Sequence, residues 1–386
     1  MIAGPQVFAQ VPAATASPNA YWEGIASSAD GSKLVAAAYA DQNLNSGELY
    51  LSTNAGATWA STSASKAYWE RVASSADGTK LAAAAYTDAA GNPGGVWTSP
   101  DSGLSWSATS APARNWMGLA SSADGQKLAA LAWGDLIYVS SDAGLTWMAA
   151  GVPRQYWQSI ASSSDGTTLL AAAFRDADMK PGPLYLSTNS GAVWVQTSAP
   201  ANSWFSVASS ADGTRLAAAS TTGAIYTSVD SGLTWISNNV PALEWFALGS
   251  SADGTQLAAA TGGESPGPVY ASSDSGRTWR PVGALSGYWA FLTCSADGSQ
   301  WAAAPGGFKP GSVYTWQTLP ALQISSSSSG VVVSWPANAK GFVLQETQDT
   351  ASQNWSDITN GIEKTSLENR AIMSQPGTKA FFRLRK

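Results

Sequence analysis

Histidine is absent from the 386 residues, and cysteine occurs only once, at Cys294. The absence of histidine removes the most frequent general base and the most frequent metal ligand from the candidate residues. A single cysteine excludes a disulfide within the chain, and we expect Cys294 to pack in an apolar strand. No run of 18 apolar residues occurs, so we expect no membrane-spanning segment.

Charged residues are also scarce, at 12% of the chain, and the formal net charge is −6. Nucleic-acid binding requires clustered Lys and Arg side chains, and the sequence contains no such cluster. We therefore expect no nucleic-acid partner. Residues 1–10 lack the basic and long apolar segments of a signal peptide.

A repeat organises most of the chain. Seven times, a Trp is followed eight residues later by the Asp of a Ser-Ala-Asp-Gly turn, which reads Ser-Ser-Asp-Gly in the fourth copy. Successive copies lie 47, 47, 41, 47, 41 and 44 residues apart. The Trp residues of this series are Trp22, Trp69, Trp116, Trp157, Trp204, Trp245 and Trp289.

A second motif, S-x-[DN]-x-G-x-x-W, occurs six times and always ends ten residues before the next Trp of the first series. Each unit then reads as four short strands, A to D in chain order, and in the first unit we expect them at 22–28, 33–39, 48–52 and from about 59. Asp-Gly suits the tight turn between strands A and B, and the Ala-rich strand B suits a sheet buried on both faces. Four strands in 41 to 47 residues is the period of a β-propeller blade.

The two ends of the repeat array predict a closed ring. Residues 12–22 align with residues 59–69, so the chain opens with a strand of type D that has no blade of its own. The last unit supplies strands A, B and C at 291–294, 300–304 and 312–315 and then lacks the second motif. We therefore predict an all-β fold, a seven-bladed β-propeller over residues 1–318 whose N-terminal strand completes the last blade.

The second motif resembles the Asp-box, or BNR repeat, of the sialidase-like β-propellers. That superfamily includes sialidases, xyloglucan hydrolases, sortilin-type receptors and a photosystem assembly factor. The resemblance implies a structural role for the motif, in which the Asp binds backbone groups of the turn and the Trp packs between strands. Asn54 and Asn189 replace the Asp in two copies, and the structural role tolerates this change.

Residues 319–386 do not continue the repeat. They contain short alternating segments at 330–335, 341–345 and 380–384, which predict a small β-sandwich. The strings Val-Val-Val-Ser-Trp-Pro, Gly-Phe-Val-Leu-Gln and Phe-Phe-Arg-Leu-Arg resemble a C-terminal fibronectin-III-like module of bacterial surface or exported proteins. This resemblance and the low charge lead us to expect an extracellular or periplasmic protein.

All of the length variation between units falls between strands B and C, in loops 40–47, 87–95, 175–183, 261–268 and 305–311. In a propeller these loops share one face with the starts of the A strands, which makes this face the candidate for function. The Trp of each A strand either packs between blades or contacts a ligand at the mouth of the ring, and the preceding Tyr is the better candidate for contact. The candidate ligand-binding residues are Tyr21, Trp22, Tyr68, Trp69, Trp116, Tyr156, Trp157, Trp204, Trp245, Tyr288, Trp289, Glu23, Glu70, Arg114, Arg154 and Glu244.

Catalysis has weak support in the sequence. Glycoside hydrolysis needs two carboxylates facing each other across a cleft, and no acidic residue of this face belongs to a distinctive motif. The Arg-Ile-Pro signature of sialidases is absent. The segment 41–45 has the alternating oxygen side chains of a calcium loop but lacks its acidic twelfth position, so we predict no metal site and no cofactor.

The sequence therefore predicts a monomeric, non-catalytic binding propeller that recognises a glycan or a surface protein at the face of the B–C and D–A loops. Two alternatives stay open. One is a glycoside hydrolase of the sialidase-like superfamily, and the other is a structural component of a surface layer or adhesion system.

Overall fold

The computed structural model describes residues 12–262, 265–306, 309–318, 322–327, 330–336, 342–348, 354–364, 368–373 and 380–385. All regular elements in these ranges are β-strands. The chain divides into a compact unit at Val11–Trp316 and a second unit that contains Gln317–Lys386. Within the described ranges no helix has the length and apolar character needed to cross a membrane.

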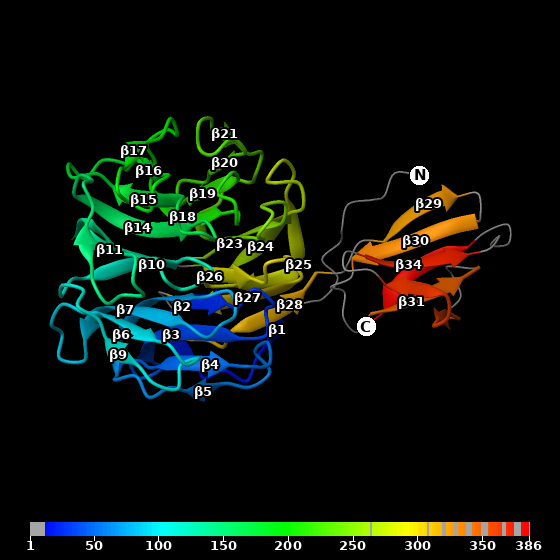
Figure 1. Ribbon diagram of the computed structural model, residues 1–386, viewed down its shortest axis with the longest axis horizontal. Coiled ribbons are helices and arrows are strands. Elements are labelled where there is room, and N and C mark those ends of the chain that lie inside the picture. The colour runs from blue at the N-terminus through cyan, green and yellow to red at the C-terminus, as the bar shows by residue number, and fades with distance from the viewer. Residues whose placement is uncertain are drawn as a thin grey trace. The chain divides into compact units, whose positions relative to one another are not determined.

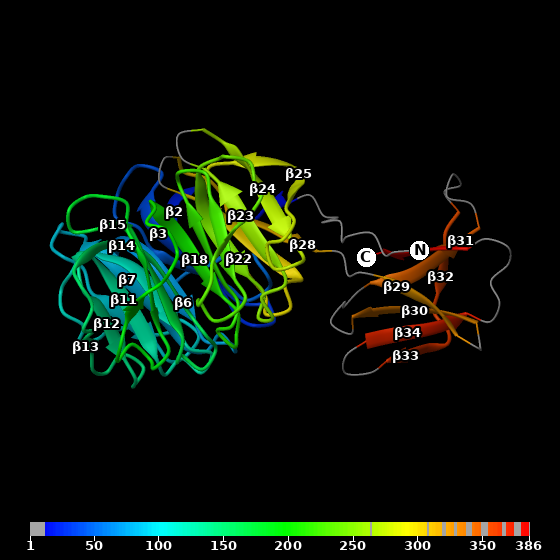
Figure 2. The ribbon, with the colours of Figure 1, turned by 90° about the horizontal axis from the view of Figure 1, so that it is seen from above.

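The first unit is a seven-bladed β-propeller, and its blades follow one another around a ring in chain order (Figure 1, Figure 2). Each blade is an antiparallel sheet of strands A to D, as the repeat predicts. Blades one to three are β2 (Ala20–Ser27), β3 (Leu34–Asp41), β4 (Leu49–Ser52) and β5 (Ala60–Ser61); β6 (Ala67–Ser74), β7 (Leu81–Asp88), β8 (Val96–Ser99) and β9 (Ser107–Ala108); and β10 (Trp116–Ser121), β11 (Leu128–Asp135), β12 (Ile137–Ser140) and β13 (Met148–Ala149).

The next three blades repeat this order. They are β14 (Gln155–Ser162), β15 (Leu169–Arg175), β16 (Leu184–Ser187) and β17 (Val195–Gln196); β18 (Trp204–Ser209), β19 (Leu216–Ser220), β20 (Ile225–Ser228) and β21 (Ile236–Ser237); and β22 (Trp245–Ser250), β23 (Leu257–Thr261), β24 (Gly267–Ser272) and β25 (Arg280–Gly287). Blades three and four are also joined to each other, because the end of β11 pairs with the start of β14.

Two ends of the chain build the seventh blade. Its strands A, B and C are β26 (Trp289–Cys294), β27 (Gln300–Pro305) and β28 (Tyr314–Gln317), and its strand D is β1 (Ala13–Ala14). Ala13 pairs with Thr315 and Ala14 pairs with Tyr314 in an antiparallel register. The predicted closure by the N-terminal strand is confirmed.

A ring of backbone hydrogen bonds joins the seven Ser-Ala-Asp-Gly turns. The second residue of each turn donates its N–H to the carbonyl of the same residue in the next blade, and the last donates back to the first. These bonds measure 2.7 to 2.8 Å and run through Ala29, Ala76, Ala123, Ser164, Ala211, Ala252, Ala296 and again Ala29. The small second residue lets the turns approach closely, and the circle is complete.

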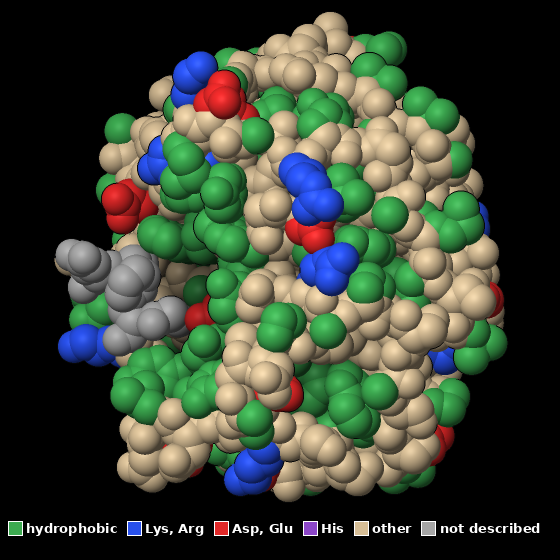
Figure 3. Space-filling view, turned by 90° about the vertical axis from the view of Figure 1, so that its left-hand side faces the viewer, with side chains coloured by type: hydrophobic (Ala, Val, Ile, Leu, Met, Phe, Trp, Pro, Cys, Tyr) green, Lys and Arg blue, Asp and Glu red, His purple; other side chains and the backbone are tan. Residues whose placement is uncertain are grey.

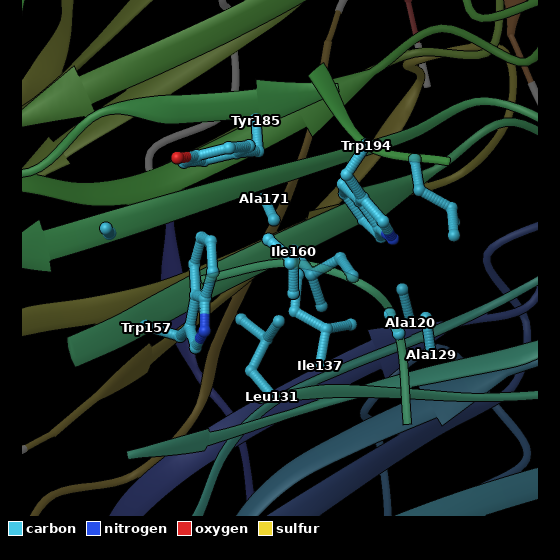
Figure 4. Close-up of a cluster of buried hydrophobic side chains, with 13 residues drawn as sticks. Ala120, Ala129, Leu131, Ile137, Trp157, Ile160, Ala171, Tyr185 and Trp194 are labelled. Atoms are coloured by element: carbon cyan, nitrogen blue, oxygen red, sulfur yellow. The ribbon is translucent and has the colours of Figure 1, made fainter. Parts of the chain in front are cut away.

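The Ala-rich B strands are buried on both faces, because each lies between two neighbouring blades. In β3, Ala36 and Ala38 pack in one cluster with residues of blade seven, whereas Val35 and Ala37 pack with residues of blade two. Each Trp of the first series fills the remaining space by packing edge-on against an aromatic residue of its own strand C. Figure 4 shows one such core, in which Trp157 lies against Leu131, Ile160 and the ring of Tyr185.

The C-terminal unit contains two sheets. One has the order β29 (Gln323–Ser327), β30 (Gly330–Pro336), β34 (Glu368–Met373) and β33 (Ile362–Lys364), and the other has the order β32 (Ser356–Ile358), β31 (Val343–Thr347) and β35 (Phe381–Arg385). Both sheets contribute to a shared core made of Val333, Trp335, Leu344, Ala371 and Leu384. This unit is therefore a small β-sandwich.

Candidate functional site

The side of the propeller where A strands begin and B strands end is called the loop face here, and the opposite side is called the turn face. The turn face carries both kinds of regular turn, and the Asp or Asn side chains of these turns accept hydrogen bonds within their own turns. At the second motif of blade three, Ser140 Oγ donates to Asp142 at 2.8 Å, and the N–H of Gly144 donates to Ser140 Oγ at 2.9 Å. Figure 3 looks onto the loop face, where hydrophobic side chains gather around a hollow and two basic side chains flank an acidic one.

The seven Trp residues do not line this surface. Six of them are fully buried and Trp289 is 2% exposed, so their predicted contact with a ligand is wrong. They occupy the blade cores, where each ring contacts an aromatic residue of strand C at a centroid distance of 5.1 to 6.2 Å. Packing between blades, the alternative that the sequence left open, is their role. The corrected positions are Trp22, Trp69, Trp116, Trp157, Trp204, Trp245 and Trp289.

The Tyr residues that precede four of these Trp residues are half-buried on the loop face, at Tyr21, Tyr68, Tyr156 and Tyr288. Two of them contact an aromatic side chain of the preceding blade. The ring centroids of Tyr68 and Tyr39 lie 4.9 Å apart, and those of Tyr156 and Trp133 lie 5.2 Å apart. The sequence interpretation missed Tyr39 and Trp133, although both follow the Ala-rich segment of a B strand.

Further aromatic side chains continue this arrangement around the loop face. Phe205 lies between Phe174 and Phe246, with centroid distances of 6.4 and 4.8 Å. In blades one to four an aromatic residue lies one or two positions before the end of strand B, and in blades five and six a Phe follows the Trp of strand A. We call the half-buried set the aromatic belt, and it comprises Tyr39, Tyr68, Tyr86, Trp133, Tyr156, Phe174, Phe205 and Phe246.

A β-bulge follows the Trp of strand A in every blade. The register between strands A and B shifts directly after the Trp in all seven blades, which leaves the following residue outside the regular pairing. A bulge of this kind changes the direction of the extra side chain. Glu23, Glu70, Phe205 and Phe246 all occupy this position.

Arg114 and Arg154 meet at one carboxylate, that of Asp135. Arg114 Nε donates to Asp135 Oδ2 at 2.6 Å, and Arg154 donates to the other oxygen. Asp135 is buried and ends β11, and its carbonyl accepts the indole N–H of Trp157 at 3.0 Å. One acidic and two basic groups leave a local excess of positive charge, and the side chain of Arg154 is 63% exposed.

Glu23 and Glu70 share a different arginine, Arg71. Its Nη1 lies 2.9 Å from Glu70 Oε1 and 3.8 Å from Glu23 Oε2, and it also donates to the carbonyl of Glu23 at 2.7 Å. The Arg71 guanidinium stacks over the ring of Phe291 at 4.6 Å. Burial raises the pKa of Glu70, and the charge of Arg71 opposes this effect. Burial and the nearby carboxylates also raise the pKa of Tyr39.

The carboxylates of two long loops, Asp41 and Asp88, accept hydrogen bonds from backbone N–H groups of the same loop. Asp41 accepts hydrogen bonds from the N–H groups of Asn43 and Asn45 at 2.8 and 3.0 Å, and the amide of Asn45 donates to its second oxygen. Asp88 is bound in the same way. Glu244 is exposed. Among the described residues no group of three His, Cys, Asp or Glu side chains could hold a metal ion.

The loop face therefore offers planar apolar rings beside an exposed guanidinium. Trp133 pairs with Tyr156 in the sheet, and Asp135, two residues further along β11, holds Arg154. Aromatic rings bind apolar groups at a small cost in conformational entropy, and guanidinium groups bind carboxylates in a planar geometry. This combination suits binding of a ligand that has both apolar and anionic parts.

No protein-family model matches the chain, and no curated protein matches it in sequence. Among solved structures, YCF48 from Cyanidioschyzon merolae is similar over 80% of this chain and 99% of that chain, with 13% identity and a TM-score of 0.58. A structure of YCF48 bound to D1 peptide is similar over 82% of this chain and 98% of that chain, with 15% identity and a TM-score of 0.59.

The GH74 enzyme of Niastella koreensis is similar over 91% of this chain, which spans 60% of that chain, with 14% identity and a TM-score of 0.61. Identities of 13 to 15% establish the fold alone. This chain has the fold of those β-propellers.

Proposed function

We propose that the protein is a non-catalytic binding propeller that takes an extended segment of another protein on its loop face. The observation that carries the proposal is the contact between Trp133 and Tyr156 beside the exposed Arg154. A polypeptide segment supplies apolar side chains and carboxylates at short spacing, which matches this combination. A structural neighbour, YCF48, is itself bound to a peptide.

Glycoside hydrolysis has less support. A glycosidase needs one carboxylic acid and one carboxylate on opposite sides of an open cleft. Here Glu23 and Glu70 share Arg71, and Asp135 is held by two arginines. The salt bridges with Arg71, Arg114 and Arg154 occupy carboxylate oxygens that a reaction would use.

The finer assignments of the sequence remain proposals. We propose that the S-x-[DN]-x-G-x-x-W turns are Asp-boxes of the sialidase-like superfamily, that residues 1–318 and 319–386 are the two domains, and that the second is fibronectin-III-like. We also propose an extracellular or periplasmic location. The hydrogen bonds of the Ser140–Asp142–Gly144 turn support the first of these assignments.

Parallel screens of the full chain against a random dodecapeptide array and a glycan array test the proposed function. We expect retention of peptides that combine an aromatic or aliphatic residue with Asp or Glu. Arg154→Ala and Tyr156→Ala should each weaken binding of such a peptide about tenfold, a loss of about 1.4 kcal/mol.

Arg277→Ala is the matched control, because Arg277 is an exposed arginine in a turn of the turn face. Its affinity should equal that of the unmodified protein. Retention of glycans without peptides would replace the protein partner with a carbohydrate. An unchanged affinity of the Arg154→Ala variant would refute the choice of face.

A further inference from the structure

A cavity of about 330 Å³ lies between blades two and three on the turn face, which is the face opposite the aromatic belt. Pockets that bind small molecules begin at about this volume. The wall from blade two includes Leu81, Thr98 and Ser107, and the wall from blade three includes Gln126, Leu128 and Leu145.

Side chains of this chain fill the corresponding place between other blades. The position of Thr98 in strand C is held by Leu51 in blade one, Val139 in blade three and Leu186 in blade four. Each of these side chains packs directly on a glycine of the next blade, and Leu51 reaches closest, onto Gly103. At Gly144 the nearest groups are the methyl groups of Thr109 and Thr98, so the strand C side chain that reaches the glycine in blades one, three and four is missing here.

Threonine occupies the same position in two further blades, and there other residues close the space. Between blades five and six the amide of Asn238 donates to Thr227 Oγ1 at 3.1 Å and to the carbonyl of Gly276 at 2.6 Å. Between blades seven and one, the large Trp301 stands where blade two has Leu81. The cavities at these two places measure only about 10 Å³ each.

The lining of the larger cavity is apolar at its base and polar at its mouth. Leu81, Ala82 and Leu128 are buried, whereas Ser107 and Gln126 are exposed. The charged groups are already engaged, since Lys80 Nζ donates to the carbonyl of Asp124 and Asp142 accepts hydrogen bonds within its own turn. Among the described residues, the hydroxyls of Thr98 and Ser107 and the amide of Gln126 have no hydrogen-bond partner, so they are available to a ligand.

We propose that this cavity is a second binding site, which takes a small neutral molecule with one apolar ring or branched aliphatic group and one hydrogen-bonding group. The apolar part replaces the side chain that Leu51 and Leu186 provide elsewhere. The polar group meets Thr98, Ser107 or Gln126. One Lys and one Asp in the lining cancel in charge, which favours a neutral ligand over an ion.

Disulfide tethering tests the site directly with a library of small thiol-bearing fragments. Ser107→Cys places a thiol at the mouth of the cavity, and Ala60→Cys places one at the corresponding exposed position of blade one, where Leu51 fills the space. Both variants carry Cys294→Ser. The fragments are equilibrated with each variant under the same reductant, and retained fragments are identified by mass spectrometry.

We expect the Ser107→Cys variant to retain neutral single-ring fragments at least about fivefold more than the Ala60→Cys variant. Adding Thr98→Leu should reduce this retention to the level of the control. Equal retention by both thiols, no effect of Thr98→Leu, or a preference for charged fragments would each overturn the proposal.

Melting temperatures of two variants show whether a loss of fragment retention comes from a filled cavity or from a damaged fold. Thr98→Leu should leave the melting temperature unchanged or raise it, because the new side chain enters empty space. Thr227→Leu should lower it, because Asn238 already occupies the corresponding place and loses a hydrogen bond. Similar losses in both variants would show that blades two and three have no room for a ligand.

Discussion

At the residue scale, two successive residues at the start of an A strand have different environments, one at the surface and one in the core. Tyr68 is half-buried at the loop face and contacts Tyr39, whereas Trp69 is fully buried and contacts Trp97. The two side chains point to different sides, as successive residues of a β-strand do. Surface contact and core packing are therefore assigned to different residues of one dipeptide.

Substitution of the two residues separates these roles. Trp69→Ala should lower the free energy of unfolding by about 3–5 kcal/mol, because it leaves a large cavity between buried strands. Tyr68→Ala should cost about 1 kcal/mol, mainly the contact with Tyr39. Urea unfolding followed by circular dichroism measures both, and comparable losses for the two variants would contradict the assignment.

At the element scale, the sequence repeat predicts where the strands lie. The β-bulge after each Trp makes the exposure of the neighbouring side chains hard to predict from the sequence. The spacing of Trp22 and Asp30 already indicated strand A and its turn, and the structure has β2 and a tight turn there. A side chain changes face with every one-residue shift of register, so an unrecognised bulge reverses the expected exposure of its neighbours. Arg114 and Arg154 lie in the loops before and after blade three and meet at Asp135 of that blade, and no spacing within one repeat indicates this contact.

The turns also carry an expected dependence on pH. Hydrogen bonds from Ser75 and Thr79 lower the pKa of Asp77 to about 2, and those from Ser163 and Thr167 do the same for Asp165. Because the folded-state pKa lies below the unfolded value of 3.8, these carboxylates stabilise the fold above about pH 4. The contribution is lost as the pH falls from about 4 towards 2.

Melting temperatures at pH 7, 5, 3 and 2.5 measure this loss. A variant with Asp77→Asn and Asp165→Asn should be less stable at pH 7 but should lose less stability on acidification. Asn54→Asp should have the opposite effect, because it adds a titrating group to a turn that already binds the backbone at Thr58. Parallel pH profiles for the three proteins would count against turn carboxylates as the source.

At the scale of the whole molecule, each blade is stabilised by two neighbours, and the ring has no free end. Blade seven depends on a two-residue strand, and further bonds support it: Thr15 N–H donates to the carbonyl of Val313 at 2.8 Å, and Ser17 Oγ accepts the N–H of Val313 at 2.7 Å. This short pairing joins residues about 300 positions apart. Opening it would expose the edge of β28 and remove strand D from blade seven.

A covalent bond across the closure should therefore stabilise the entire propeller. Ala13 and Thr315 are direct partners in an antiparallel pair, a separation that a disulfide spans. Ala13→Cys with Thr315→Cys, in a Cys294→Ser background, should raise the free energy of unfolding by about 2–4 kcal/mol when oxidised, because the bond restricts a very long loop in the unfolded chain. Serine at position 294 matches the other six blades, which have Ser there. The gain should vanish on reduction and be absent from both single-cysteine variants, whereas an unchanged melting temperature with the disulfide formed would mean that the closing strand separates only after the blades have unfolded.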